Sequence, residues 1–232
     1  MDFVIFGLEH NLYLIGIFSI WLIILYIGKA ILNEDQRRIL VFFLIVVSIG
    51  QELIDDILRW NAGIWIIAED LPLHMCGISL FTSVFAIYKK NQTAFELSYF
   101  WGLAGGFQAI ITPDPNRFVL DVSTFWNFLS HGIIILNVLW LIVIDNMRCR
   151  NGSFINTIII TNGCLFIISI VNTILGGNYW FLCEKPGGDS PFIIGDWPLY
   201  LIGFEISGIL LLGLFYIPMI ILRKRDANFA IS

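Results

Sequence analysis

Residues 12–31 read LYLIGIFSIWLIILYIGKAI, with Lys29 as the one charged residue. A helix needs about 20 apolar residues to cross the hydrocarbon core of a bilayer. This stretch is therefore long enough and apolar enough to span a membrane. The residues before it contain Asp2 and Glu9 but no lysine or arginine. Because a cleaved signal peptide begins with a basic segment, we expect this helix to be retained.

The whole chain has the composition of a membrane protein. Of its 232 residues, 58% are hydrophobic and 13% are charged, and the mean hydropathy is +0.83. A soluble domain carries about 25% charged residues, so most of this surface must face lipid. No basic surface for nucleic acid is present. The four cysteines form no CxxC pair or metal-binding spacing, and no nucleotide-binding signature occurs. We expect no cofactor and no metal.

Six more apolar segments follow the first one. We predict an all-α, single-domain fold of seven transmembrane helices at residues 12–31, 39–58, 71–88, 96–111, 125–144, 154–175 and 199–222. The fourth is short, rich in glycine and ended by Pro113. Glycines let membrane helices approach closely, so we expect this helix to lie centrally, with little contact with lipid.

Positive charge is distributed unevenly between the two ends of these helices. Of the 13 lysines and arginines, ten fall on one side: Lys29, Arg37, Arg38, Lys89, Lys90, Arg148, Arg150, Arg223, Lys224 and Arg225. The other side holds Arg59, Arg117 and Lys185. Short loops rich in lysine and arginine stay in the cytoplasm. The bias predicts an N-terminus outside the cell and a C-terminus in the cytoplasm.

Polar side chains within the helices gather toward their predicted outer ends. Ionisable and amide groups inside a membrane helix are costly and by default mark function. Here they are Gln51, Glu52, Asp55, Asp56, His74, Cys76, Gln108, His131, Asn172 and Glu205. At 1.5 Å per residue, Cys76 and His131 lie about 7 to 9 Å below the outer ends of their helices. The pattern predicts one site in the outer third of the membrane, whereas the cytoplasmic half is nearly all apolar.

Cys76 and His131 are the candidate catalytic residues. A thiolate forms where an imidazole takes the thiol proton, and it is a strong nucleophile. His74 is closer in sequence but points about 200° away around a helix, so His131 is the better base. Glu52 or Asp55 would orient His131. The alternatives are that Cys76 is a small buried apolar residue and that His131 makes an interhelical hydrogen bond.

Other residues have both structural and supporting interpretations. Asp55 and Arg59 are spaced for an ion pair within one helix. Asn172, Asn178 and Tyr179 belong to a helix end turned by glycines, and Asn178 is also a candidate oxyanion donor. We expect His10 to be solvated. We assign four tryptophans to an outer aromatic belt without chemistry: Trp60, Trp65, Trp180 and Trp197.

A disulfide is the other possible use of the cysteines. Cys76 and Cys183 are the two on the predicted outer side, and Cys183 lies in the long loop 176–198. Cys76 is too deep in its helix to make this pairing the preferred interpretation.

Four ordered motifs resemble a known family. They are LPLHMC (71–76), YFWGLAGGFQAIITP (99–113), Ser130–His131 and GGNYWFLCEKP (176–186). Together they are similar to the multi-pass membrane proteins that include the bacterial YwaF-like proteins and the eukaryotic transmembrane protein 164. The resemblance implies acyl transfer on ether phospholipids through a cysteine, at Cys76, with a histidine at His131. One departure is Gly77, where we expect many bacterial members to carry a carboxylate.

Two functional hypotheses follow. The first is a lipid acyltransferase or acyl-ester hydrolase that uses Cys76 and His131 near the outer leaflet, supported by His74, Glu52, Asp55, Gln108, Asn172, Asn178, Tyr179 and Glu205. Its partners would be membrane lipids and its location a bacterial plasma membrane. The second is a non-catalytic membrane protein that binds lipid or a small solute, or transports it. No inverted repeat or pair of broken helices, the usual signs of a transporter, occurs in the sequence.

Overall fold

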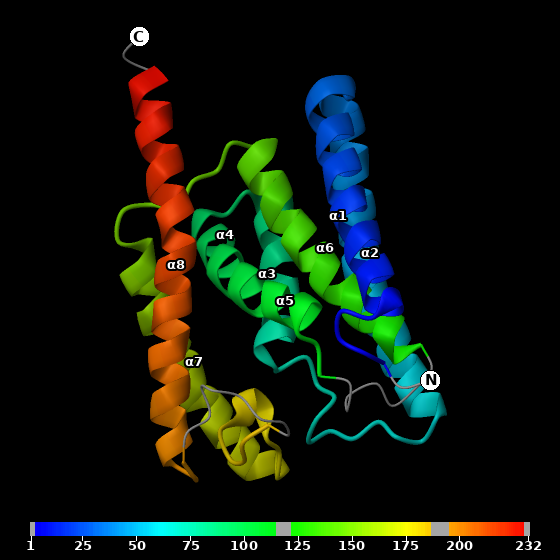
Figure 1. The fold of residues 1–232 in the computed structure, drawn as a ribbon, viewed down its shortest axis with the longest axis vertical. Coiled ribbons are helices and arrows are strands. Elements are labelled where there is room, and N and C mark those ends of the chain that lie inside the picture. The colour runs from blue at the N-terminus through cyan, green and yellow to red at the C-terminus, as the bar shows by residue number, and fades with distance from the viewer. Residues whose placement is uncertain (1–2, 115–121, 187–194, 230–232) are drawn as a thin grey trace.

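The computed structural model describes residues 3–114, 122–186 and 195–229, which are helical without strands (Figure 1). Helix α1 (Leu8–Tyr26) continues into a π-helical turn, η1 (Ile27–Ile31), and is followed by α2 (Glu34–Asn61) and α3 (Met75–Lys89). The fourth helix is composite: α4 (Gln92–Leu97), the π-helical η2 (Ser98–Gly102) and α5 (Leu103–Ile111). Then come α6 (Ser123–Val143), α7 (Ser153–Leu175), the 3₁₀ turn η4 (Tyr179–Phe181) and α8 (Leu199–Phe229). The predicted all-α fold of seven helices is confirmed.

The lateral surface of the bundle is apolar. Four helical stretches are long and apolar enough to cross a membrane: Leu8–Ile31, Ser123–Val143, Ser153–Leu175 and Leu199–Asn228. Large apolar side chains on several helices are well exposed, including Leu22 (71%), Ile39 (69%) and Ile174 (74%). Exposed apolar area on this scale needs lipid or protein to cover it. The chain is therefore a multi-pass membrane protein.

The helices form a central group with a pair on either side (Figure 1). Helices α3 to α6 lie in the middle, with α1 and α2 on one side and α7 and α8 on the other. Helix α6 packs against α1, α2, α3 and α5, whereas α8 packs against α5 and α7. In the apolar stretch of α6, 56% of the residues are buried, against 11% in α1, α7 and α8. Helix α6 is thus the core helix, and the other three face lipid.

The composite fourth helix lies centrally, as its glycines predicted. From Tyr99 to Ala104 every residue is buried. A Cβ on Gly102 would lie 2.8 Å from Cγ2 of Ile134, and one on Gly106 would lie 3.1 Å from two side-chain carbons of Ile135. The missing side chains therefore let this helix pack against the backbone of α6.

The helix ends differ from the predicted ends because local capping decides them. Helix α2 begins at Glu34 rather than at residue 39, since Asn33 and Gln36 form a reciprocal capping box. Helix α3 begins at Met75 rather than at residue 71, after a segment that contains Pro72. Helix α8 continues to Phe229, beyond residue 222. Hydropathy locates the apolar part of a helix, whereas these helices extend beyond it or begin within it.

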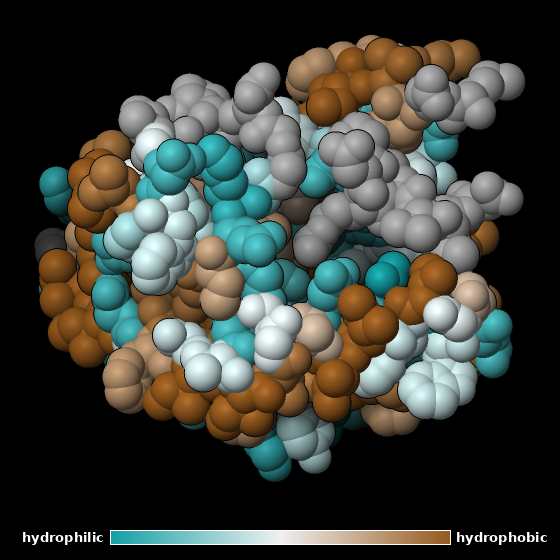
Figure 2. Space-filling view, turned by 90° about the horizontal axis from the view of Figure 1, so that it is seen from below, coloured by the Kyte–Doolittle hydropathy of each residue, from teal (hydrophilic) through white to brown (hydrophobic). Residues whose placement is uncertain are grey.

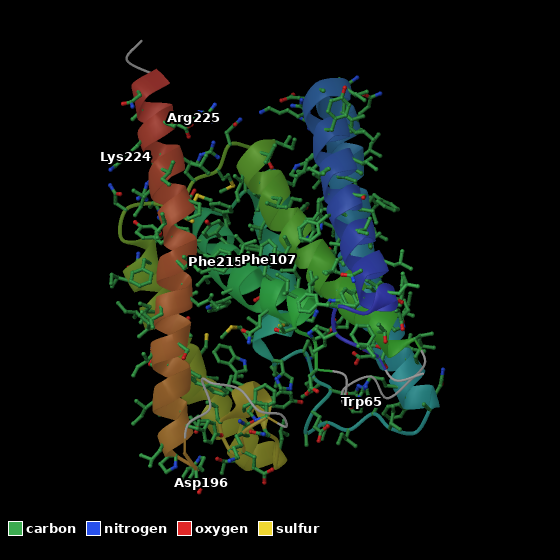
Figure 3. All side chains as sticks on the ribbon, in the orientation of Figure 1. Trp65, Phe107, Asp196, Phe215, Lys224 and Arg225 are labelled. Atoms are coloured by element: carbon green, nitrogen blue, oxygen red, sulfur yellow. The ribbon has the colours of Figure 1, made fainter. Side chains whose placement is uncertain are left out.

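The two ends of the bundle differ in character. The end near the C-terminus, here called the basic end, carries Lys224 and Arg225, while Trp65 and Asp196 lie at the opposite end (Figure 3). At the basic end, Lys29 donates to the backbone carbonyl of Val143. Between the two ends, the rings of Phe107 and Phe215 stack 6.0 Å apart and join α5 to α8 (Figure 3).

Candidate functional site

Cys76 is the second residue of α3, at the end of the bundle opposite the basic end. A Cβ on Gly105 of α5 would lie 3.8 Å from the Cys76 sulfur, so the thiol faces a part of α5 that has no side chain. Next to it, a Cβ on Gly77 would lie 2.8 Å from the carbonyl oxygen of Pro72. The fold of this chain therefore excludes a carboxylate at position 77, which explains the glycine there.

His131 belongs to α6, which packs against both α3 and α5. A Cβ on Gly106 would lie 3.8 Å from the His131 carbonyl oxygen, next to the glycine that faces the Cys76 sulfur, and the His131 imidazole interacts electrostatically with the Cys76 thiol. The Nδ1–H of His131 donates to the backbone carbonyl of Asn127, one turn earlier, at 2.8 Å. This bond fixes the tautomer and leaves the Nε2 lone pair for the thiol. The structure thus places Cys76 and His131 on neighbouring helices beside the same part of α5, and their catalytic role stays a prediction.

A carboxylate and an amide on α2 complete the surroundings of His131. The charge of Glu52 interacts with the imidazole of His131. Gln51, which is buried, donates to the Glu52 carboxylate at 3.3 Å and to the hydroxyl of Ser130 at 3.5 Å. Helices α2, α3 and α6 therefore each contribute a polar group to one place.

This arrangement suits nucleophilic chemistry in principle. An imidazole whose Nδ1–H is held by an acceptor presents Nε2 as a base. It can take the proton of a neighbouring thiol, and the thiolate is the nucleophilic form of cysteine. A nearby carboxylate such as Glu52 would stabilise the imidazolium that results.

Asn172 and Tyr179 connect the end of α7 to the segment that precedes α3. The side chain of Asn172 donates to the Tyr179 carbonyl at 2.9 Å and accepts from the Tyr179 N–H at 2.8 Å. The Tyr179 hydroxyl donates to the carbonyl of Ile67 and accepts from the N–H of Leu71. Gly176 adopts a left-handed φ of +63° and ends α7, as its sequence predicted. These residues position the segment that leads into Cys76.

Asn178 and His74 lie in the same region, between the end of α7 and the start of α3. The Asn178 side chain accepts from the N–H groups of Cys183 and Glu184 and donates to the Glu184 carbonyl. Its amide is thus used by the loop, so the suggested oxyanion role has no support in this structure. His74 caps α3 and lies edge-on to Tyr179, with ring centroids 5.0 Å apart.

Glu205 and Gln108 have surroundings that do not include Cys76 or His131 among their described contacts. Glu205 accepts from the Asn162 side chain at 3.0 Å, between α8 and α7. Gln108 is exposed near the end of α5. Asp55 is half-buried on α2, near Glu52. The suggested pair between Asp55 and Arg59 is wrong, because Arg59 forms its ion pair with Asp70 at 2.7 Å.

Three further predictions can be compared with the structure, and the first two are wrong. His10 is fully buried rather than solvated: it donates to the carbonyl of Ile110 and accepts from the N–H of Phe6, each at 2.8 Å. Trp180 is also buried and donates to the carbonyl of Leu73, so it does not belong to an aromatic belt. None of the four cysteines forms a disulfide, so Cys76 and Cys183 are not paired.

Sequence reasoning also missed polar groups deeper in the bundle. Asn137 of α6 is fully buried and donates to the hydroxyls of Ser48 and Ser83 at 3.1 and 3.2 Å. Near the basic end, the buried carboxylate of Glu96 pairs with Arg150 at 2.8 Å. The half of the bundle that was expected to be nearly all apolar therefore contains a buried carboxylate paired with a half-exposed arginine. An asparagine or glutamate within an apolar run was the available signal.

Figure 2 shows the face opposite the basic end. Hydrophilic residues gather around a hollow near its middle, and hydrophobic residues form much of the rim. A helical bundle with an apolar perimeter and polar groups converging at one end defines a polytopic membrane protein with a candidate site in its interior. Residues 5–216 match the sequence pattern of the TMEM164 family, and the chain belongs to that family. No curated protein and no solved structure gives a significant match.

Proposed function

We propose that this chain moves acyl groups to or from lipid esters in a bacterial plasma membrane, with Cys76 as the nucleophile and His131 as the general base. The observation that carries the proposal is that Cys76 and His131 border the adjacent glycines Gly105 and Gly106 of α5, where the thiol and the imidazole interact electrostatically. It is supported by the Asn127 carbonyl, which holds Nδ1–H and frees Nε2. The family resemblance points to the same two residues.

In the proposed mechanism, the Cys76 sulfur attacks the ester carbonyl carbon while its proton passes to Nε2 of His131. The tetrahedral intermediate collapses, the ester C–O bond breaks, and His131 returns the proton to the leaving alcohol. A thioester on Cys76 remains. An acceptor alcohol then attacks it as His131 takes the acceptor's proton, the C–S bond breaks, and the Cys76 thiolate leaves and is reprotonated by His131. With water as the acceptor, the same steps hydrolyse the ester.

We infer an orientation in which all seven helices cross the membrane, with the N-terminus outside. The described chain ends lie at opposite ends of the bundle (Figure 1), as an odd number of crossings requires. The cations of the basic end would face the cytoplasm. Cys76 and His131 would then lie toward the outer leaflet, at a depth that suits an ester linkage just below the headgroups.

Reporter fusions test this orientation. A reporter after residue 232 should be active in the cytoplasm, and one inserted at residues 187–190 should be active outside; both positions lie beyond the described residues. The reason is the ten-to-three distribution of basic residues. Opposite activity at both positions would reverse the orientation, and activity on the same side would contradict an odd number of crossings.

The second candidate is a binder or transporter of a small solute. The observation that favours it is the polar series of Gln51, Ser48 and Asn137, because Gln51 donates to the Ser48 carbonyl and Asn137 to the Ser48 hydroxyl. A transporter should depend on Glu52, Asp55 or Glu205 and tolerate Cys76→Ser. A thiol enzyme should not tolerate that change.

Lipid analysis of cells separates the two candidates. Cells that express the protein should differ from cells without it in the acyl composition of their lipid esters. Cells that express Cys76→Ala should match cells without the protein, because the thioester cannot form. Cys164→Ala, on α7, is the matched control and should behave like the wild type. A wild-type lipid profile with Cys76→Ala would remove the enzyme proposal.

A further inference from the structure

A small pocket lies near the basic end, away from Cys76. It has a volume of about 160 Å³ and is formed by α4 and α7, with Arg150 from the segment before α7. Its polar lining includes Thr93, Glu96 and Asn156, and its apolar lining includes Leu97, Ile159 and Ile160. The pocket thus has both a charged part and a hydrocarbon part.

The guanidinium in this pocket is held in one orientation. Nε and Nη2 of Arg150 donate to the two carboxylate oxygens of Glu96 at 3.0 and 2.8 Å. Nη2 also donates to the hydroxyl of Thr93 at 3.1 Å. Glu96 accepts further bonds from the Arg150 N–H and the Gln92 side chain. Among the described residues no group accepts from Nη1, although the Arg150 side chain is 54% exposed. The two Nη1 protons of Arg150, which lines the pocket, are therefore left to donate to a ligand.

The lining of the pocket changes from polar to apolar along the axis of α7. Helix α7 begins at Ser153. Asn156 lies about 5 Å along the helix from there, and Ile159 lies about 9 Å along it. Ile159 is 64% exposed, so the apolar part opens to the side, where lipid lies. This order of groups matches a lipid, whose charged headgroup continues into hydrocarbon.

The surrounding charge favours an anion. The nearby carboxylates already have cationic partners: Glu96 pairs with Arg150, Asp145 with Lys90, and Asp226 with Arg148. Arg223 has no carboxylate partner among the described residues and donates to the Cys149 carbonyl and to the Tyr216 hydroxyl. That hydroxyl in turn lies 3.4 Å from the Arg150 carbonyl. A surplus guanidinium therefore lies close to Arg150.

We propose that this pocket binds an anionic phospholipid of the cytoplasmic leaflet. The phosphate accepts hydrogen bonds from Arg150 and Asn156, and the beginning of an acyl chain packs against Leu97, Ile159 and Ile160. Glu96 acts as the group that fixes the guanidinium. A soluble phosphate would fill only the polar part. The proposal depends on the membrane orientation and not on any chemistry at Cys76.

Thermal unfolding of the full-length protein in neutral detergent tests the proposal. Phosphatidylglycerol at about ten times its dissociation constant should raise the unfolding midpoint by about 3 to 6 °C. Phosphatidylcholine and glycerol 3-phosphate should give rises of no more than about 1 °C, since each lacks part of what the pocket recognises. Equal rises with the two lipids, or a full rise with glycerol 3-phosphate, would overturn the proposal.

Two variants localise the effect. Ile159→Trp fills the apolar part and keeps the Arg150–Glu96 pair, and it should abolish the response to phosphatidylglycerol. Its matched control is Phe166→Trp, two turns further along the same exposed face of α7 (71% exposed), which should keep the response. If Ile159→Trp does not fold, the double variant Arg150→Gln, Glu96→Gln decides, because it removes the donors without leaving a single buried charge. A full response in the pocket variant that folds would place the lipid elsewhere and overturn the proposal.

Discussion

His131→Ala should slow the reaction of Cys76 with an electrophilic acyl probe by about 100-fold or more, which is the usual contribution of a general base. In the proposed mechanism Nε2 of His131 accepts the Cys76 proton, so the thiolate fraction should fall without it. Labelling at each cysteine of the purified protein, followed over time by mass spectrometry, measures the effect. The probe must be neutral and soluble in lipid to reach the depth of Cys76.

The other cysteines provide internal controls for this measurement. Cys183 is exposed and should react at the same rate in the wild type and in His131→Ala. Cys149 is fully buried, and burial raises the pKa of its thiol above the usual range, so it should remain unlabelled in both. Cys164, partly buried on α7, should react more slowly than Cys76 in the wild type. Equal labelling of Cys76 with and without His131 would show that the imidazole does not activate the thiol.

Glu52→Gln separates the role of the carboxylate from that of the base. The change keeps the size of the side chain and removes the charge that interacts with His131. In the proposed mechanism Glu52 stabilises the imidazolium and does not take the proton itself, so Glu52→Gln should slow the labelling less than His131→Ala does. A larger loss would mean that Glu52 has the more direct role.

The sequence was sufficient for the parts of the fold that depend on composition alone. Apolar runs of about 20 residues predict membrane helices. The glycines at Gly102 and Gly106 predict close packing, regardless of which helix is the neighbour. The neighbouring placement of α3 and α6 is consistent with the similar depth predicted for Cys76 and His131, which lie on helices that run in the same direction. The depth of a residue in the membrane can be counted along its helix, so it can be predicted from the sequence alone.

The parts that failed depend on contacts between distant residues. His10 is buried because a carbonyl 100 residues later accepts its hydrogen bond, and nothing near His10 in sequence indicates this. The prediction that Trp180 belongs to an aromatic belt failed for the same reason, since its hydrogen-bond acceptor is the distant carbonyl of Leu73. Arg59 had two available carboxylates, and the chain reversal at residues 62–70 brings Asp70 to it rather than Asp55.

The ion pair between the buried Glu96 carboxylate and the half-exposed Arg150 guanidinium should contribute strongly to stability. The Glu96 side chain is 4% exposed, and the Arg150 side chain is 54% exposed. Removing Arg150 leaves a carboxylate buried without its cation, whereas removing Glu96 leaves a guanidinium that water or lipid headgroups can solvate. Breaking a buried pair from one side costs about 3 to 5 kcal/mol. Arg150→Ala should therefore destabilise the protein by an amount near the lower end of that range, because Gln92 still donates to Glu96.

Unfolding midpoints in neutral detergent without anionic lipid measure this cost, in a cycle of Arg150→Ala, Glu96→Ala and the double variant. For a chain of this size about 3 kcal/mol corresponds to a shift of about 6 to 12 °C, which we expect for Arg150→Ala. Glu96→Ala should shift the midpoint less, and the double variant should be more stable than Arg150→Ala because no buried charge is left unpaired. The matched control is Arg38→Ala, whose side chain is 76% exposed beside Glu34 and Asp35 and which should shift the midpoint by no more than about 2 °C. A double variant less stable than Arg150→Ala would show that Glu96 stabilises the protein through its packing and its bonds to Gln92 and the Arg150 N–H, and not through its charge.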